Sequence, residues 1–177
     1  MPTHIGFLRA VNIGKRQYKT ADLRAALEGA GYTDVETHIQ TGNVRITSPL
    51  RSTTKVEEAL EALFLADRGF EVVTMVFTPQ QLTELAADAD ALGDEHGFEY
   101  GQYVSVLKRE PDAATRKEVE ALSSDVERFV VRGRAVHMLY DVPYGTSKTA
   151  TRLERIAGPA TNRNATVIRT LAEKWGA

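Results

Sequence analysis

The short link between two apolar runs, Thr41-Gly42-Asn43, is the feature that most constrains the fold of this chain. Residues 34–40 and 44–47 are rich in strand-forming residues, and only these three residues separate the two runs. A polar, glycine-bearing link of this length is typical of a tight hairpin, which makes the two strands antiparallel neighbours. The chain therefore predicts an antiparallel sheet, because parallel strands would need a much longer crossover between them.

Helices and strands are expected on both sides of this hairpin. Apolar residues recur at helical spacing in two stretches, each closed by a glycine, and two further runs carry strand-forming residues. The resulting order is strand-helix-strand-strand-helix-strand, which predicts a ferredoxin-like (split βαβ) subdomain over residues 4–77. Its flanking elements are strands at 4–13 and 71–77, a helix that Thr20 caps and Gly31 ends, and a helix that begins at Thr53 and ends at Gly69.

The rest of the chain predicts a connection and then a second copy of the same pattern. Residues 78–101 are expected to hold a linking helix followed by an acidic loop at 88–101, whose five acidic residues and three glycines predict high mobility. Residues 102–177 predict a second ferredoxin-like subdomain with a terminal helix, so the fold class is α+β with tandem antiparallel sheets. Its elements are strands at 102–107, 127–131 and 135–140, a short strand at 159–161, and helices that begin at Asp112, Ser147 and Asn164.

Composition excludes several kinds of protein. The chain has 177 residues, 42% of them hydrophobic and 26% charged, which suits one soluble domain or two small subdomains. It contains no cysteine, which excludes disulfides, thiolate catalysis and cysteine-based metal sites. No apolar run reaches the roughly 20 residues of a membrane helix and the start does not resemble a signal peptide, so a cytoplasmic location and no membrane partner are expected. The four histidines lack metal-ligand spacing, so no metal is expected. No cofactor is expected either.

Charge is distributed unevenly along the sequence. Residues 1–51 carry a formal charge of +3, residues 52–130 carry −10, and residues 131–177 carry +5. If the two basic ends meet, they form a locally positive surface that suits an anionic ligand. The alternative is that the acidic helices carry solubilising charge and the basic ends have no common role.

Polar side chains follow the first strand and flank the hairpin. Arg9, Asn12 and Lys15 lie in the segment that leaves the first strand, while Gln40 and Asn43 lie at the turn. Guanidinium and amide groups at a sheet rim suit the recognition of a base, a phosphate or a carboxylate. Two structural roles stay open as alternatives, because Asn43 suits turn geometry and Arg9 suits an internal ion pair.

A second candidate group lies towards the C-terminus. Ser147 and Asn164 are each expected to cap a helix, with Lys148 and Arg163 beside them. Two helix N-termini, each with an adjacent cation, favour anion binding. The alternative is that both residues are ordinary caps and both cations are solvated. The segment resembles a phosphate-binding loop only superficially, because its lysine follows the serine and the upstream glycine is missing.

Five short motifs together resemble one known family. In order and separation they resemble the family called domain of unknown function 1697, over nearly the whole chain. The family is similar to tandem ferredoxin-like subdomains, and the resemblance implies no established activity. The motifs are Leu8-Arg9-Ala10-Val11-Asn12-Ile13-Gly14, Asp22-Leu23-Arg24, Ile39-Gln40-Thr41-Gly42-Asn43-Val44, Tyr144-Gly145-Thr146-Ser147-Lys148 and Thr161-Asn162-Arg163-Asn164-Ala165-Thr166-Val167.

Four positions depart from the family pattern. Ala10 stands where glycine is usual, Lys15 where a second glycine is common, His38 where an aromatic residue is usual, and Ala165 where tryptophan often follows Arg-Asn. The first change reduces the backbone freedom of the first loop. The last removes any ligand contact that the tryptophan makes in relatives.

These observations predict a cytoplasmic binding protein for a phosphate-bearing small molecule or nucleic acid, through a polar cationic site. Arg9, Asn12, Gln40, Asn43, Lys148, Arg163 and Asn164 are expected to border one concave surface. Two other functions remain open, namely an enzyme of unrecognised class that uses Arg9, Lys148 and Arg163 electrostatically, and a scaffold whose motifs serve only folding. The sequence identifies no catalytic residue and gives no oligomeric state.

Overall fold

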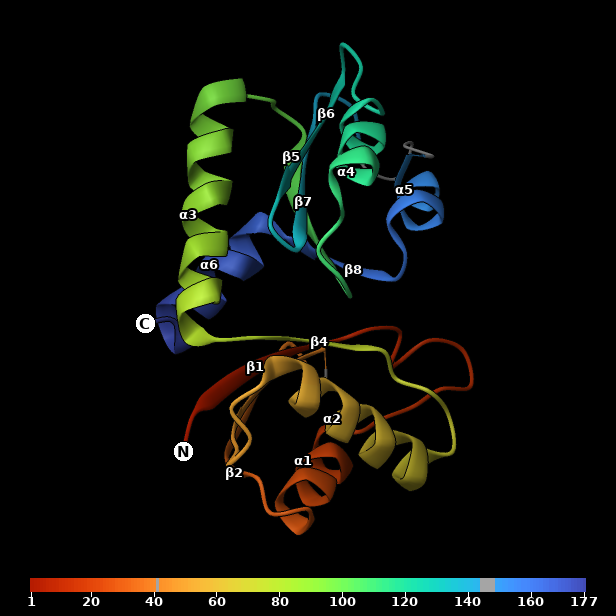
Figure 1. Ribbon diagram of the computed structural model, residues 1–177, viewed down its shortest axis with the longest axis vertical. Helices are drawn as coiled ribbons and strands as arrows, with labels where there is room; N and C mark the ends of the chain where they lie inside the picture. Colours follow the sequence, from red (N-terminus) through yellow and green to blue (C-terminus); the bar gives the residue numbers. More distant parts are fainter. Residues whose placement is uncertain (41, 144–148) are drawn as a thin grey trace. The chain divides into compact units, whose positions relative to one another are not determined.

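The computed structural model describes residues 1–40, 42–143 and 149–177. These residues form two compact units. The first unit contains Met1–Leu82 together with the C-terminal Lys174–Ala177, and the second contains Thr83–Glu173 (Figure 1). Each unit is built around its own sheet and its own apolar core.

The first unit has the strand and helix order that the sequence predicts. Its four-stranded sheet has the order β2-β3-β1-β4, and all neighbouring strands are antiparallel. The predicted antiparallel sheet with two helices is therefore confirmed. The elements are β1 (Thr3–Leu8), α1 (Thr20–Gly29), β2 (Thr33–His38), β3 (Asn43–Thr47), α2 (Thr53–Arg68) and β4 (Thr74–Phe77).

Both helices of the first unit pack on one face of this sheet (Figure 1). Leu27 of α1 and Phe64 of α2 are fully buried and belong to one cluster with Val44 and Ile46 of β3. Gly69 ends α2 in a left-handed conformation with φ of 77°, as the sequence predicts. The predicted cap of α1 is wrong by one residue, because Lys19 holds the N-cap position and Thr20 is the first helical residue.

The hairpin is confirmed, and its loop lies slightly earlier than predicted. His38 pairs with Asn43, so residues 39–42 form the turn, and Thr41 lies outside the described residues. Ile39 and Gln40 both have positive φ angles, of 52° and 53°. This left-handed backbone is unfavourable for a β-branched residue such as Ile39. The hairpin therefore holds local strain.

The second unit repeats the order of the first. Its sheet has the order β6-β7-β5-β8, again with antiparallel neighbours throughout. Helix α3 begins at the end of the first unit and continues into the second. The elements are α3 (Pro79–His96), β5 (Gly101–Leu107), α4 (Ala113–Glu120), β6 (Glu127–Arg132), β7 (Ala135–Tyr140), α5 (Thr149–Ala157), β8 (Ala160–Asn164) and α6 (Ala165–Trp175).

Two expectations for this region are corrected. Residues 88–96, predicted as part of an acidic loop, continue α3 to His96. Ala89 and Leu92 are buried and extend the apolar stripe of Leu82 and Leu85 at helical spacing, so the acidic residues only occupy the outer side of a helix. Strand β8 is also longer than the predicted 159–161, because Ala160–Asn164 pairs along β5.

The predicted helix starts of the second half are confirmed where they fall on described residues. Thr78 and Gln81 form a reciprocal capping box at the start of α3, with distances of 3.1 and 2.9 Å. Asp112 caps α4 by accepting from the Thr115 amide at 2.8 Å. Asn164 accepts from the Thr166 amide at 2.8 Å at the start of α6.

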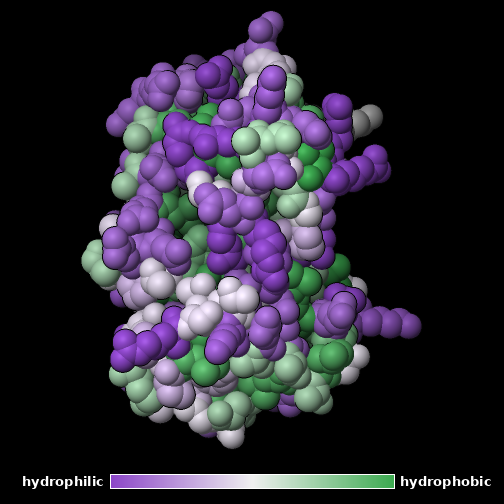
Figure 2. Space-filling view, viewed as in Figure 1, coloured by the Kyte–Doolittle hydropathy of each residue, from purple (hydrophilic) through white to green (hydrophobic). Residues whose placement is uncertain are grey.

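Surface character agrees with the charged composition. Hydrophilic residues cover much of the face drawn in Figure 2, with smaller hydrophobic areas between them. Among the described residues, no helix is both long and apolar enough to cross a membrane.

Candidate functional site

The segment between β1 and α1 borders a pocket of about 320 Å³ in the first unit. All the lining side chains can form hydrogen bonds, and the segment that follows β1 and the β2–β3 turn both contribute. Two of the predicted site residues, Asn12 and Gln40, are thus brought together. The complete lining is Asn12, Gln17, Tyr18, Lys19, Thr20 and Gln40.

Backbone pairing explains why the first loop meets the hairpin. The Leu8 amide donates to the Gly42 carbonyl at 2.9 Å, and the Arg9 amide donates to the Val73 carbonyl at 2.9 Å. The chain then turns out of the sheet at Ala10, whose φ of 55° is left-handed. Three non-glycine residues with positive φ (Ala10, Ile39 and Gln40) therefore lie in these two neighbouring turns, and such strain often accompanies functional sites.

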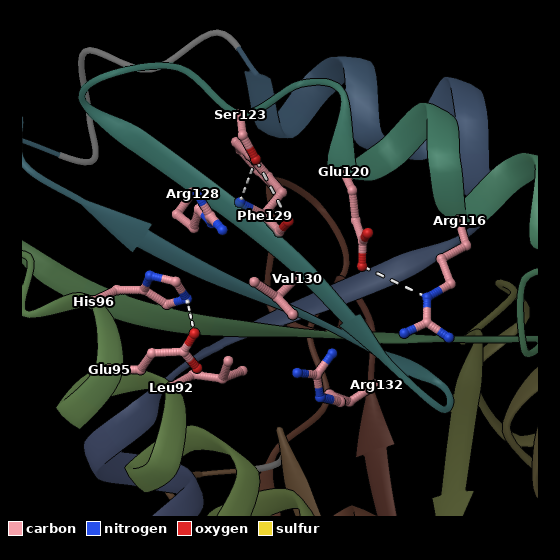
Figure 3. Close-up of a pocket in the computed structure, with 10 residues that line it drawn as sticks. All are labelled: Leu92, Glu95, His96, Arg116, Glu120, Ser123, Arg128, Phe129, Val130 and Arg132. Carbon is pink, nitrogen blue, oxygen red and sulfur yellow. Dashed lines mark hydrogen bonds and ion pairs between the residues drawn. The ribbon is translucent and has the colours of Figure 1, made fainter.

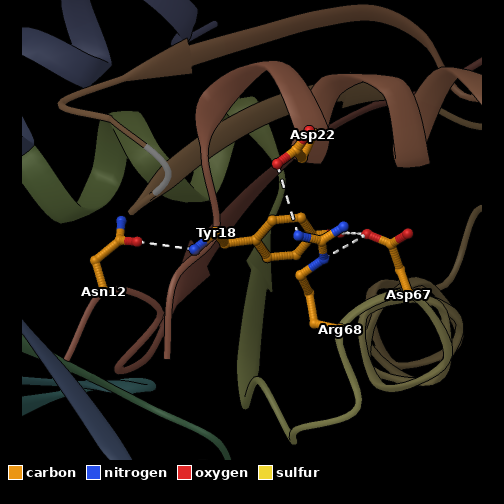
Figure 4. Close-up of polar contacts among 5 residues, drawn as sticks. All are labelled: Asn12, Tyr18, Asp22, Asp67 and Arg68. Atoms are coloured by element: carbon orange, nitrogen blue, oxygen red, sulfur yellow. Dashed lines mark hydrogen bonds and ion pairs between the residues drawn. The ribbon is translucent and has the colours of Figure 1, made fainter. Parts of the chain in front are cut away.

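Asn12 fixes the shape of the loop. Its Oδ1 accepts a hydrogen bond from the Tyr18 amide at 2.9 Å, across the exposed residues 13–17 (Figure 4). This contact ties the start of the loop to the residue before the N-cap of α1. The amide side chain of Asn12 consequently has a defined orientation at the pocket.

Tyr18 anchors the loop to α2. Its hydroxyl donates to Asp67 Oδ2 at 2.7 Å, and the Arg68 guanidinium lies 5.0 Å from the centre of its ring (Figure 4). Arg68 also pairs with Asp22 at 3.6 Å, which draws that carboxylate towards α2. Burial and the hydrogen bond to Asp67 raise the pKa of the Tyr18 hydroxyl far above its usual range, so it stays a neutral donor. The ring is only 1% exposed and forms a rigid wall.

Lys19 gives the pocket its positive charge. It occupies the N-cap of the 10-residue helix α1 and makes no side-chain capping bond, because an ammonium group has no acceptor. The first amides of a helix without a capping side chain keep their hydrogen-bonding capacity, and the helix dipole adds partial positive charge there. An ammonium group and a helix N-terminus thus lie at the same pocket.

The other predicted residues of this cluster have different surroundings. Arg9 is half-buried just after β1, and Lys15 is exposed outside the lining of the pocket. Asn43 is 1% exposed, and its Nδ2 donates to the His38 carbonyl at 3.0 Å. That contact closes the hairpin, which agrees with the structural alternative for Asn43.

The described members of the second predicted cluster, Arg163 and Asn164, lie in the other unit. Arg163 is half-buried in β8, and its Nη1 donates to Thr161 Oγ1 and to the Asn162 carbonyl, each at 2.9 Å. Burial lowers the pKa of Arg163 to about 10. Asn164 caps α6, whereas Ser147 and Lys148 lie outside the described residues. The convergence of both clusters on one surface therefore stays a prediction.

Sequence reasoning missed four lining residues, Gln17, Tyr18, Lys19 and Thr20. A signal was present, because a lysine stands where a helix start usually carries serine, threonine, aspartate or asparagine. Assigning the cap to Thr20 concealed that signal. In the described part of the chain, no three histidine, aspartate or glutamate side chains are grouped to hold a metal.

Comparisons with known proteins agree with the architecture and the motifs. The conserved bacterial protein SP0830 of Streptococcus pneumoniae has a similar structure, with a TM-score of 0.78, 21% sequence identity, and coverage of 99% of this chain and 98% of the other. A likeness at this identity shows the fold. No curated protein matches the sequence. The model of the family described as "Protein of unknown function (DUF1697)" matches residues 1–137, and the chain belongs to that family.

Proposed function

We propose that the chain binds a phosphate-bearing small molecule in the pocket of the first unit. The observation that carries this proposal is a pocket of about 320 Å³ that combines the start of α1, where Lys19 holds the N-cap position without capping it, with amide side chains from two neighbouring turns. A volume of this order suits a small molecule and is small for a nucleic-acid strand. Nucleic acid is therefore the less favoured partner.

The phosphate group would lie at the start of α1. Phosphates bind at helix N-termini because the amide N–H groups point towards them and the dipole favours negative charge. Lys19 adds a full positive charge at the same place, and Thr20 adds a hydroxyl. The nearest carboxylate of the helix, Asp22, is paired with Arg68, which reduces its repulsion of an incoming anion.

The uncharged part of the ligand would lie towards the hairpin. Gln40 belongs to the hairpin turn, Gln17 also lines the pocket, and Asn12 is oriented by its contact with the Tyr18 amide. Amide groups both donate and accept, so they suit the hydroxyls of a sugar or the edge of a base. These considerations favour a nucleoside monophosphate or a sugar phosphate.

A single substitution separates binding from folding at this site. Lys19→Ser removes the cation. It also supplies a capping oxygen that competes with the ligand for the first backbone amides of α1. The cap should stabilise the chain by about 0.5–1 kcal/mol, since serine is a preferred N-cap residue. Affinity for adenosine monophosphate, measured from the amide chemical shifts of residues 12–20, should fall at least tenfold.

The matched control is Lys55→Ser on α2, which removes the same charge from an exposed position in the same unit. It should leave the affinity within twofold of the unsubstituted chain. If Lys19→Ser binds adenosine monophosphate as tightly as Lys55→Ser does, the pocket is not the binding site.

We also propose that each unit is ferredoxin-like. The strand-helix-strand-strand-helix-strand order and the equivalent strand orders β2-β3-β1-β4 and β6-β7-β5-β8 support this assignment. On this view the two units arose by duplication, and the ligand-binding loop of the first unit follows its first central strand.

A further inference from the structure

The second unit contains another pocket, of about 390 Å³, beside strand β6 (Figure 3). Residues of α3, of β6, and of α4 with the turn that follows it line the pocket. Strand β6 lies at the edge of the sheet, where one row of backbone groups has no neighbouring strand. Cationic side chains gather along this edge.

Side chains take the place of a neighbouring strand along β6. Ser123 Oγ accepts from the Phe129 amide at 3.0 Å, and Glu120 Oε1 accepts from the Val131 amide at 3.1 Å. The Val131 carbonyl accepts from Arg116 Nη2 at 3.2 Å and from Arg132 Nη1 at 3.1 Å. The two guanidinium groups therefore meet at one carbonyl oxygen.

This meeting point has an excess of positive charge. Arg116 Nε lies 3.5 Å from Glu120 Oε1, and the same oxygen also accepts the hydrogen bond from the Val131 amide. Within the described ranges, neither Arg128 nor Arg132 has a carboxylate within 4.0 Å. The positive charge of Arg132 also affects His137. Burial is the larger cause and the Arg132 charge the smaller one, and both lower the pKa of this histidine. Two like charges held together in this way are stabilised by an anion between them.

The floor of the pocket is apolar and has cations at both ends. Val130 lies between Arg128 and Arg132 on β6, and these alternate residues share one face of the strand. Val130 packs with Leu92 of α3 in a small cluster. His96 at the end of α3 completes the rim, with Nε2 3.7 Å from Glu95. A ligand in this pocket therefore meets Arg116 and Arg132 at one end, Val130 in the middle, and Arg128 with His96 at the other end.

We propose that this pocket binds a phosphate monoester, with its dianionic group between Arg116 and Arg132 and its organic part over Val130. A guanidinium has five N–H donors in a planar fork, and each of these two arginines gives only one to the Val131 carbonyl. Arg116 Nε is paired with Glu120, and the other donors suit the oxygens of a phosphate. The pocket is separate from the one in the first unit and does not depend on the function proposed for that one.

The test uses the full chain and measures affinity from the amide chemical shifts of residues 128–132, because the first-unit pocket is also proposed to take a sugar phosphate. Ribose 5-phosphate is titrated into the unsubstituted protein and into Arg132→Gln, Arg132→Lys and the control Arg152→Gln. Arg152 is exposed on α5 of the same unit and does not line the pocket. Arg152→Gln therefore removes the same charge as Arg132→Gln without changing the pocket. Arg132→Gln should weaken binding at least tenfold and Arg132→Lys several-fold, whereas Arg152→Gln should stay within twofold.

Two further measurements make the assignment specific. Inorganic phosphate should bind at least tenfold more weakly than the ester, since it leaves the apolar floor uncovered. Amide chemical shifts on titration should change at residues 128–132, which separates this site from the pocket at residues 12–20. Equal affinity for inorganic phosphate, equal losses in Arg132→Gln and Arg152→Gln, or shift changes confined to residues 12–20 would each overturn the proposal.

Discussion

Ala10 adopts a backbone conformation that glycine adopts more readily. Its φ of 55° is left-handed, and this region costs an L-residue with a β-carbon roughly 1–2 kcal/mol. The chain therefore carries strain at the start of the loop that forms the pocket.

Ala10→Gly should thus be neutral or stabilising by up to about 1 kcal/mol, because relief of the strain offsets the greater entropy of glycine in the unfolded chain. The comparison is Ala25→Gly, at an exposed position within α1, which should cost about 1 kcal/mol through lost helix propensity. Urea denaturation gives both free energies of unfolding. Equal destabilisation by the two substitutions would contradict the strain at Ala10.

His137 is a fully buried titratable residue of the second unit. It lies in β7, and neither ring nitrogen has a hydrogen-bond partner among the residues that the structure describes. Burial, assisted by the nearby Arg132 charge, lowers its pKa from 6.5 to about 4. The folded protein therefore holds this ring neutral at pH values where the unfolded chain protonates it.

Stability should fall as the pH drops from about 6.5 to about 4, because the unfolded state binds a proton that the folded state excludes. The difference between the two pKa values corresponds to about 3 kcal/mol at most. His137→Leu should lose that much less stability than the unsubstituted chain between pH 7 and pH 4, measured by urea denaturation. Parallel pH profiles for the two proteins would show that His137 does not contribute.

At the scale of elements, the sequence predicted a helix or strand correctly wherever its apolar periodicity agreed with a residue typical of its first or last position. The hairpin before Asn43, the end of α2 at Gly69 and the start of α4 at Asp112 were all predicted from a few neighbouring residues. The continuation of α3 past Asp88 was not predicted. The acidic composition of this stretch suggested a loop, although its apolar residues continue at helical spacing to Leu92. Composition describes only the solvent side of such a helix.

The pockets were harder to predict than the elements. Asn12 and Gln40 meet because β1 and β3 are paired, and the motif positions indicated that rim. Arg116 and Arg132 were missed, since Arg116 lies on a helix in the acidic stretch 52–130 and Arg132 lies on a strand at the start of the basic stretch 131–177, so no local motif joins them. Only the pairing of α4 side chains with the β6 edge brings them together.

The edge of β6 provides a test of this pairing. Ser123 bonds both backbone groups of Phe129, accepting from its amide at 3.0 Å and donating to its carbonyl at 3.5 Å. Ser123→Ala leaves both groups of a buried residue without that partner, which should cost about 1–3 kcal/mol. Ser124→Ala removes an exposed bond to the Val126 amide and should cost less than 1 kcal/mol. Thermal unfolding of the two variants measures this difference in stability. Similar melting temperatures would argue against a role for Ser123 in capping the edge of β6.

At the scale of the whole molecule, the chain returns to its first unit at the C-terminus. Lys174–Ala177 belong to that unit, although the preceding residues of α6 belong to the second. Trp175 is 5% exposed, and its indole Nε1 donates to Glu36 Oε2 at 3.0 Å. Its ring also meets His38 edge-to-face at 6.3 Å. The last residues therefore hold the edge strand β2 of the first sheet.

Trp175→Ala should destabilise the first unit by about 3–5 kcal/mol, the usual cost of truncating a buried tryptophan. Trp175→Phe keeps most of the apolar contact and loses the bond to Glu36, so it should cost less, about 1–2 kcal/mol. Amide hydrogen exchange locates the effect, with faster exchange expected in β2 and β3. Tyr100→Ala, at a 58% exposed aromatic residue, serves as the control and should leave exchange in β2 unchanged. Faster exchange confined to β5–β8 in Trp175→Ala would mean that the tail stabilises the second unit instead.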